Sequence, residues 1–328
     1  MRTVKRSLLK FVAAAGVASL MATAASAQTK WDMPVPYADG NFHTKNDIQF
    51  AKDVEKATKG ALVIKIHSAG SLIKHKEIKR AVRQNTAPIG EILESLAANE
   101  APVYGIDSVP FLATGYAAAK KLYAAQKPYL EKQLASEGLM LLYSVPWPPQ
   151  GLYTKKAINS VADLKGLKFR TYNVMTGRIA ALLGAIPTQI EVPDLPTAFT
   201  TGRVDAMITS ASTGVNTKAQ DYLKYYYDIQ AWLPRNIVFV NKQAFDALPA
   251  GVQKAVLAAA KTAEARGWKV SEKEMTDKTN ILRKSGLKVE KPSPALKAGF
   301  AKVGTTLAAE WEKSAGAEGK AILDAYRK

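Results

Sequence analysis

The most informative segment of the chain reads Ser160-Val161-Ala162-Asp163-Leu164-Lys165-Gly166-Leu167-Lys168-Phe169-Arg170-Thr171-Tyr172-Asn173. Asp163 can cap a short turn, Gly166 can close it, and the alternation from Leu167 to Thr171 predicts a strand. A helix is expected to begin near Asn173, which places Arg170 at the carboxyl end of that strand. Ligands of open α/β sheets bind at such ends, and a guanidinium suits a carboxylate. A surface salt bridge is the alternative interpretation of a single arginine.

The first 27 residues have the pattern of a secretory signal peptide. Lys5 and Arg6 precede an apolar, alanine-rich run, and Ala25-Ser26-Ala27 matches the small-x-small cleavage pattern. We therefore expect export to the periplasm of a Gram-negative cell and a mature chain that starts near Gln28. No other segment approaches about 18 apolar residues in a row. The chain contains no cysteine, so disulfides and thiol chemistry are excluded.

The chain is basic, with a formal net charge of +18, and four of its positive charges lie in residues 1–27. The other lysines and arginines are spread singly or in pairs among acidic residues. Proteins that bind nucleic acids cluster such charges in a stripe, so we expect no nucleic-acid partner. Solvated lysine faces explain the excess, which also helps to draw anions toward a cleft.

Strand and helix patterns alternate over residues 30–92 and again over residues 167–209. This alternation predicts an α/β protein of two lobes, each with a mainly parallel sheet flanked by helices. The three prolines of Pro146-Trp147-Pro148-Pro149-Gln150-Gly151 predict the crossing between the lobes, because proline suits neither a helix nor a central strand. A strand from Ile237 to Asn241 is expected to return to the first lobe.

The last third of the chain is predicted to be helical. One pattern from Pro249 to Arg283 would form a helix of roughly 50 Å that lies across both lobes. Residues 293–328 are expected to form closing helices that cap the second lobe. The predicted domains are therefore a signal peptide at 1–27, lobe I at 28–147 plus about 238–270, and lobe II at 148–237 plus about 271–328.

Most enzyme signatures are missing. The sequence has no phosphate-cradling glycine loop, no serine nucleophile elbow and no HExxH motif. The three histidines, His43, His67 and His75, lack the spacing of metal ligands. We expect no metal, no cofactor and no catalysis, although a triad assembled across long separations stays open as an alternative.

The chain resembles the periplasmic solute-binding subunits of TRAP transporters (tripartite ATP-independent periplasmic transporters, DctP-type). The resemblance covers nearly all of residues 28–328, and its motifs occur in the family's order and spacing. The motifs are the Phe42 to Thr58 helix with Gly60-Ala61-Leu62, then Ser68-Ala69-Gly70-Ser71-Leu72, Ser108-Val109-Pro110-Phe111-Leu112, the segment from Ser160 to Arg170, and Thr201-Gly202-Arg203-Val204-Asp205. The resemblance implies a two-lobed clamshell with a long helix that braces both halves.

The resemblance also implies roles for single residues. Arg170 matches the arginine that grips the carboxylate of an organic acid, and Glu94 falls where sialic-acid-type members place a glutamate that faces the ligand. Gln150 stands where several members carry a second ligand-binding arginine. Thr209 stands where many carry an asparagine that touches the substrate. The loss of one cation favours a monocarboxylate over a C4-dicarboxylate.

Four further residues are candidates for contact with the ligand. Trp147 at the lobe junction could stack on a ring or a sugar face, although core packing is its alternative. Phe42 is a similar aromatic candidate. Asn236 precedes the return strand and could offer its amide. Asn173 lies at the expected helix start beyond Arg170.

The function expected from this resemblance is that of a monomeric receptor that closes around a small organic acid and delivers it to the small and large membrane subunits of the transporter. Uronic or aldonic acids, 2-oxo or hydroxy acids, pyroglutamate and aromatic carboxylates all remain open as ligands. Two other functions stay open as well. One is a binding protein that serves a sensor or another transporter, and the other is a periplasmic hydrolase or lyase acting on an organic acid.

Overall fold

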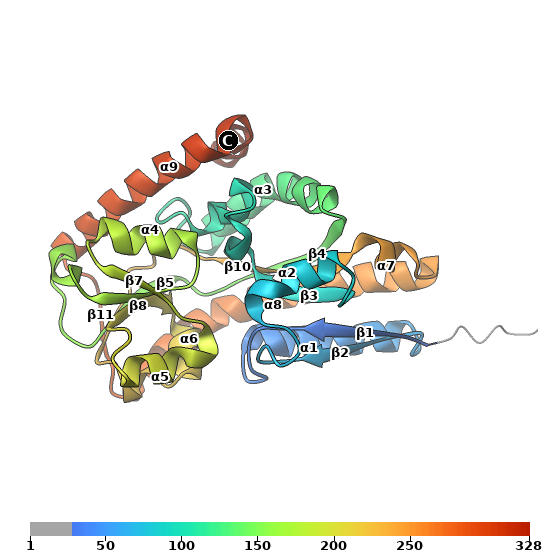
Figure 1. Ribbon diagram of the computed structural model, residues 1–328, viewed down its shortest axis with the longest axis horizontal. Coiled ribbons are helices and arrows are strands. Elements are labelled where there is room, and N and C mark those ends of the chain that lie inside the picture. Colours follow the sequence, from blue (N-terminus) through green and yellow to red (C-terminus); the bar gives the residue numbers. More distant parts are fainter. Residues whose placement is uncertain (1–27) are drawn as a thin grey trace, which may run out of the picture.

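The computed structural model describes residues 28–328, so the predicted signal peptide at 1–27 lies outside the described residues. The chain forms two lobes, each built on its own sheets and covered by helices (Figure 1). Lobe I holds a two-stranded sheet and a three-stranded sheet, and lobe II holds a six-stranded sheet. Within the described part of the chain, no helix has both the length and the apolar character needed to cross a bilayer.

Lobe I begins with the alternation of strands and helices that the sequence predicts. Its first elements, in chain order, are β1 (Thr29–Pro34), α1 (Phe42–Ala57), β2 (Leu62–His67), α2 (His75–Arg83), β3 (Ile89–Leu93), the 3-10 helices η1 (Glu94–Ala97) and η2 (Pro102–Ser108), α3 (Tyr116–Ser136) and β4 (Leu139–Pro146). The alternation expected over residues 30–92 is confirmed.

Lobe II contains the predicted strand with Arg170 and several short elements that the pattern does not reveal. Its elements are β5 (Gln150–Thr154), η3 (Val161–Leu164), β6 (Lys168–Thr171), α4 (Val174–Leu182), β7 (Ile186–Gln189), η4 (Val192–Asp194), α5 (Leu195–Thr200), β8 (Ala206–Ser210), α6 (Ala211–Asn216), η5 (Ala219–Asp221) and β9 (Tyr225–Tyr227). The last part of the chain forms β10 (Arg235–Asn241), α7 (Lys242–Asp246), α8 (Ala250–Lys284), β11 (Lys288–Glu290) and α9 (Pro294–Arg327).

The sheets are mixed, which corrects the expectation of mainly parallel sheets. In lobe I, β10 lies between β3 and β4 and pairs antiparallel with both. In lobe II, β5 pairs antiparallel with β8 and β9, whereas β6 is parallel to β7 and β8. The reason is the crossing of the chain: β5 enters from lobe I and β10 returns from lobe II, so each runs against its neighbours. The pairing of β10 confirms the predicted return strand.

Helix α8 connects the two lobes along 35 residues. Pro249 precedes its first residue, which suits proline because the first amides of a helix need no partner within it. At 1.5 Å per residue the helix is about 50 Å long. It packs against α1 and β4 in lobe I and against α6 in lobe II (Figure 1). The predicted long helix is confirmed.

Helix α9 reaches both lobes, although residues 293–328 were expected to cap lobe II alone. Its first part buries Leu296 and Phe300 in the same core as Phe169 of lobe II. Its later part buries Trp311 and Ile322 against lobe I, in the core that contains α3 (Figure 1). Gly316, with a φ of +56°, breaks the helix between Trp311 and Ile322, within the part that packs on lobe I. The apolar residues of the two parts together tie the lobes to each other.

A buried polar cluster fills the centre of lobe I. His43 and Asp47 lie one turn apart on α1, and the Glu91 carboxyl of β3 lies 3.5 Å from the Nδ1 atom of His43. The Tyr143 hydroxyl donates to Asp47 at 2.7 Å. Burial raises the pKa of Asp47 to about 7, raises the pKa of Glu91, and lowers that of His43. Proximity of Asp47 raises the pKa of Glu91 further.

We expect this cluster to make stability depend on pH. The folded state holds protons on the buried carboxyls more tightly than the unfolded chain does, so their contribution is complete below the ordinary pKa of aspartate, 3.8, and is lost as pH rises through about 7. Asp47→Asn keeps an acceptor for Tyr143 and removes the titration. Relative to the native protein, its melting temperature should rise by a few degrees more at about pH 8 than at about pH 5. An equal difference at both values, measured by thermal unfolding, would contradict the assignment.

The contact between α8 and β4 yields a second test of the fold. A Cβ on Gly267 would collide with both methyls of Val145, whereas a Cβ on Gly251 of the same helix would meet nothing. Gly267→Ala should therefore destabilise the protein by about 1–3 kcal/mol through overpacking. Gly251→Ala, the matched control, should leave the melting temperature unchanged or slightly raised. Equal melting temperatures for the two variants would show that the helix is not seated as described.

Candidate ligand-binding site

The segment from Ser160 to Asn173 folds as two capped turns around a strand. Ser160 caps η3, and the Asp163 carboxylate accepts from the backbone amides of Asn159 and Ser160 at 2.8 and 2.9 Å. Gly166 turns the chain with a φ of +75° into β6. Asn173 then caps α4, and its side-chain oxygen accepts from the Thr176 amide at 2.8 Å. These turns fix Arg170 near the carboxyl end of a strand that is parallel to both neighbours.

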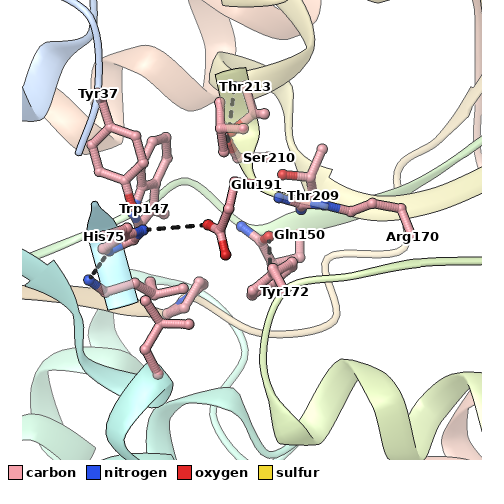
Figure 2. A pocket seen from close by; sticks show the side chains of 14 residues that line it. Tyr37, His75, Trp147, Gln150, Arg170, Tyr172, Glu191, Thr209, Ser210 and Thr213 are labelled. Atoms are coloured by element: carbon pink, nitrogen blue, oxygen red, sulfur yellow. Dashed lines mark hydrogen bonds and ion pairs between the residues drawn. The ribbon is translucent and has the colours of Figure 1, made fainter. Parts of the chain in front are cut away.

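A small cavity lies between the lobes at this end of β6, with about 400 Å³ of empty space. Figure 2 shows side chains from both lobes around it. Lobe I and the lobe junction contribute Tyr37, His75, Leu93, Leu96, Trp147 and Pro234, and lobe II contributes Gln150, Arg170, Tyr172, Glu191, Val192, Thr209, Ser210 and Thr213. A larger cleft adjoins it and shares His75, Leu96 and Tyr172.

Arg170 brings a buried positive charge to the cavity, since only 2% of the residue is exposed. Its Nε donates to the Ile190 carbonyl at 2.9 Å, and its guanidinium lies 4.6 Å from the centre of the Tyr172 ring. Among residues 28–328, no group accepts a hydrogen bond from its two terminal nitrogens. Burial lowers its pKa, and neighbouring groups including Tyr172 and Glu191 oppose that shift. An arginine stays charged in proteins, so these nitrogens can serve an anion.

Aromatic rings form the lobe I side of the cavity. The Trp147 and Tyr37 rings meet edge to face at 5.0 Å, and the Tyr37 and His75 rings do so at 5.6 Å. The indole nitrogen of Trp147 donates to the Asn236 side chain at 2.8 Å. Phe42 packs on the Trp147 ring at 5.4 Å and does not line the cavity. Asn236 and Phe42 therefore support Trp147 from behind.

Polar groups of lobe II line the opposite side (Figure 2). The Gln150 amide donates to the Pro148 carbonyl at 2.9 Å, and its oxygen accepts from the Tyr172 hydroxyl at 3.3 Å. Thr209, on β8, also lines the cavity. Of the eight predicted contact residues, Arg170, Trp147, Gln150 and Thr209 thus come together around one space.

Glu94 lies elsewhere, inside lobe I. Its carboxylate meets the Arg235 guanidinium at 3.1 Å, and Gln126 hydrogen-bonds to both side chains. All three are fully buried, and none lines the cavity. The expectation that Glu94 faces a ligand is not supported by this placement. The cause is the turn from β3 into η1, which directs Leu93 into the cavity and Glu94 toward Arg235.

Asn173 lines the larger neighbouring cleft rather than the cavity. Its side-chain amide donates to the Ser95 hydroxyl at 2.7 Å. Because Ser95 belongs to lobe I and Asn173 to lobe II, this hydrogen bond joins the lobes beside the cavity.

Glu191, His75 and Tyr37 are cavity residues that the sequence patterns did not indicate. Glu191 follows β7, and its Oε2 lies 3.7 Å from the Nδ1 atom of His75 across the lobes. Its Oε1 lies 3.7 Å from the Lys76 ammonium. Desolvation raises the pKa of Glu191, but His75, Arg170 and Lys76 outweigh that effect and bring it below the ordinary value. All three residues stand in or beside irregular loops, where no periodicity marks which side chains point inward.

The site is suited to holding an anion. It combines one buried guanidinium, hydrogen-bonding groups on lobe II and aromatic walls on lobe I. Within the described chain, no group of three or more His, Cys, Asp or Glu residues is arranged to hold a metal ion.

Comparisons with known proteins identify the family of the chain. The family model described as "DctP: Bacterial extracellular solute-binding protein, family 7" matches residues 38–314. DctP7, an extracytoplasmic solute receptor of Bordetella pertussis that is described as binding pyroglutamic acid, is 47% identical with a TM-score of 0.91, and the match covers 92% of this chain and all (100%) of that chain. DctP6 of the same organism, also described as binding pyroglutamic acid, is 50% identical with a TM-score of 0.90 over 91% of this chain and 99% of that chain.

A third solved structure is a TRAP solute-binding protein from a marine metagenome. It is described as specific for pyroglutamate, is 43% identical with a TM-score of 0.90, and the match covers 92% of this chain and 99% of that chain. The resemblance drawn from the sequence motifs is confirmed, and so is the two-lobed α/β fold. The chain belongs to family 7 of the bacterial extracellular solute-binding proteins, the DctP family.

Proposed function

We propose that this protein is a periplasmic receptor of a TRAP transporter and that its ligand is pyroglutamate. The receptor binds the acid between its lobes as a monomer and passes it unchanged to the small and large membrane subunits. The observation that carries this proposal is the buried guanidinium of Arg170, whose terminal nitrogens have no partner among the described residues. A buried charge needs a counter-charge, and a ligand carboxylate supplies one.

The form of the cavity supports a small, compact acid. Pyroglutamate combines one carboxylate with a five-membered lactam ring, which has apolar methylenes, one carbonyl and one N–H group. The carboxylate meets Arg170, and the methylenes lie against Trp147 and Tyr37. The carbonyl and the N–H group remain for the polar side of the cavity. Three solved proteins that are 43–50% identical to this chain bind the same acid, which supports the choice of ligand.

Binding and closure are linked because both lobes contribute to the cavity. A ligand that contacts both lobes binds the closed form better than the open one. A shift from mostly open to mostly closed requires about 5 kcal/mol of differential affinity. A buried bidentate ion pair with several hydrogen bonds can supply free energy of this order. The bound acid thereby gives the membrane subunits a closed surface to recognise.

Two buried arginines allow a matched test of the site. Arg170→Ala should weaken pyroglutamate binding by about 100-fold or more and abolish the ligand-dependent rise in melting temperature, because the carboxylate loses its counter-charge. Arg235→Ala removes an equally buried arginine that pairs with Glu94. It should destabilise the protein by about 3–5 kcal/mol, yet the folded fraction should still bind.

Calorimetry and thermal shift on the three proteins distinguish these outcomes, with Arg235→Lys in reserve should Arg235→Ala not fold. Normal binding by Arg170→Ala would refute the central assignment. Loss of binding in the folded Arg235 variant would instead indicate that the ligand binds inside lobe I, beside Arg235.

A receptor returns its ligand unchanged. We expect pyroglutamate incubated with the protein to keep its NMR spectrum, and recovery of the free acid after unfolding to be complete. Appearance of glutamate, the product of lactam hydrolysis, would instead favour the hydrolase alternative.

A further inference from the structure

The carboxylate of Glu191 is the one acidic side chain that lines the cavity within the described chain. We propose that Glu191 is a specificity-determining residue, which accepts a hydrogen bond from a donor on the ligand and so selects acids that carry an N–H or O–H group. The inference rests on the proposed function and adds to it, because it concerns the hydrogen-bond donor of the ligand. Arg170 has only donor groups and cannot bind that part of the ligand.

One oxygen of this carboxylate has no hydrogen-bond partner. Oε1 is buried, and no donor among residues 28–328 reaches it within hydrogen-bonding distance. Its closest cation, the Lys76 ammonium, is 3.7 Å away, which is too long for a hydrogen bond. Buried carboxylate oxygens are normally bonded, since the loss of water is otherwise uncompensated. Figure 2 shows Glu191 extending into the space between His75 and Gln150, where a ligand would lie.

The surroundings keep Glu191 in its charged, accepting form. His75 accepts from the Leu93 amide through Nε2 at 3.0 Å, so its proton is on Nδ1, the atom that faces Glu191 at 3.7 Å. Lys76 and Arg170 add positive charge nearby. A charged carboxylate accepts hydrogen bonds and donates none. It therefore favours a ligand donor and opposes a ligand oxygen or a second ligand carboxylate.

Arg170 and Glu191 are held at a fixed separation by the backbone. The Arg170 Nε bonds to the carbonyl of Ile190, the residue just before Glu191. The Arg170 guanidinium and the Glu191 carboxylate are thus both positioned by the same backbone segment, Ile190–Glu191. A ligand that satisfies both groups carries its acid and its donor close together, as the carboxylate and the adjacent N–H of pyroglutamate do.

Glu191 also connects this recognition to closure. It belongs to lobe II, whereas His75 and Lys76 belong to α2 of lobe I. These contacts cross between the lobes, so the surroundings of the acceptor are complete only where the lobes meet. A ligand lacking the donor leaves a buried charged oxygen without a bond, and such a site rejects it strongly.

The test compares two ligands that differ in one atom. 3-Oxocyclopentane-1-carboxylate has the ring, carboxylate and carbonyl of pyroglutamate, with CH₂ in place of N–H. By calorimetry the native protein should prefer pyroglutamate by about 10- to 100-fold. Glu191→Leu should reduce that ratio to within about 3-fold, because it removes the acceptor, and Glu191→Gln, which keeps an uncharged acceptor, should give an intermediate ratio. Glu77→Gln removes the same charge from the exposed face of α2 and should keep the native ratio.

The ratio of the two affinities tests recognition by Glu191. If Glu191 had only a structural role, its replacement would weaken the binding of both ligands alike and leave the ratio unchanged. A native ratio near one, or an unchanged ratio in Glu191→Leu, would overturn the role of Glu191 and leave the proposed function standing. Failure of the native protein to bind either ligand would instead overturn pyroglutamate as the ligand, and this inference with it.

Discussion

A guanidinium buried without a bonded carboxylate is the constraint on which the site depends. Arg170 and Arg235 are both almost completely buried, but only Arg235 is paired with a carboxylate of the protein. Arg235 meets Glu94 and Gln126 inside lobe I, so its charge is compensated by the protein. Arg170 donates to one carbonyl through Nε, and its two terminal nitrogens have no hydrogen-bond acceptor among the described residues. Burial of a charge costs several kcal/mol unless it is paired, and for this reason the surroundings of Arg170 suit an anion.

The architecture around Arg170 joins the site to both lobes. The cavity has walls from both lobes, and the Asn173–Ser95 hydrogen bond and the Glu191–His75 contact cross between them. Helices α8 and α9 pack on both lobes and so connect them. In the proposed mechanism, an anion held in the cavity therefore stabilises one relative position of the two lobes.

Several parts of this structure could be predicted from the sequence. The long helix, the helix α1 and the return of β10 follow from periodicity and from glycine and proline positions, which are local properties. Arg170 could be placed because the carboxyl end of a parallel strand is a general ligand site. Trp147 was a candidate because of its place at the lobe junction, whereas Gln150 and Thr209 were candidates because of the positions that the family resemblance assigns to them. The antiparallel pairing of β5 and β10 could not be read in this way, because a strand pattern carries no direction.

The amino-acid sequence by itself determined the export signal as a prediction, the alternation of strands and helices, the family, and Arg170 as the candidate contact for the acid. Each of these depends on residues close together in the chain or on motifs in a set order. The tertiary structure decided which side chains share the cavity. It directed Glu94 to Arg235, 141 positions away along the chain, and brought Glu191 of one lobe to His75 of the other. Burial and charge act through space, so the partner of a charged side chain is known only when the lobes are in place.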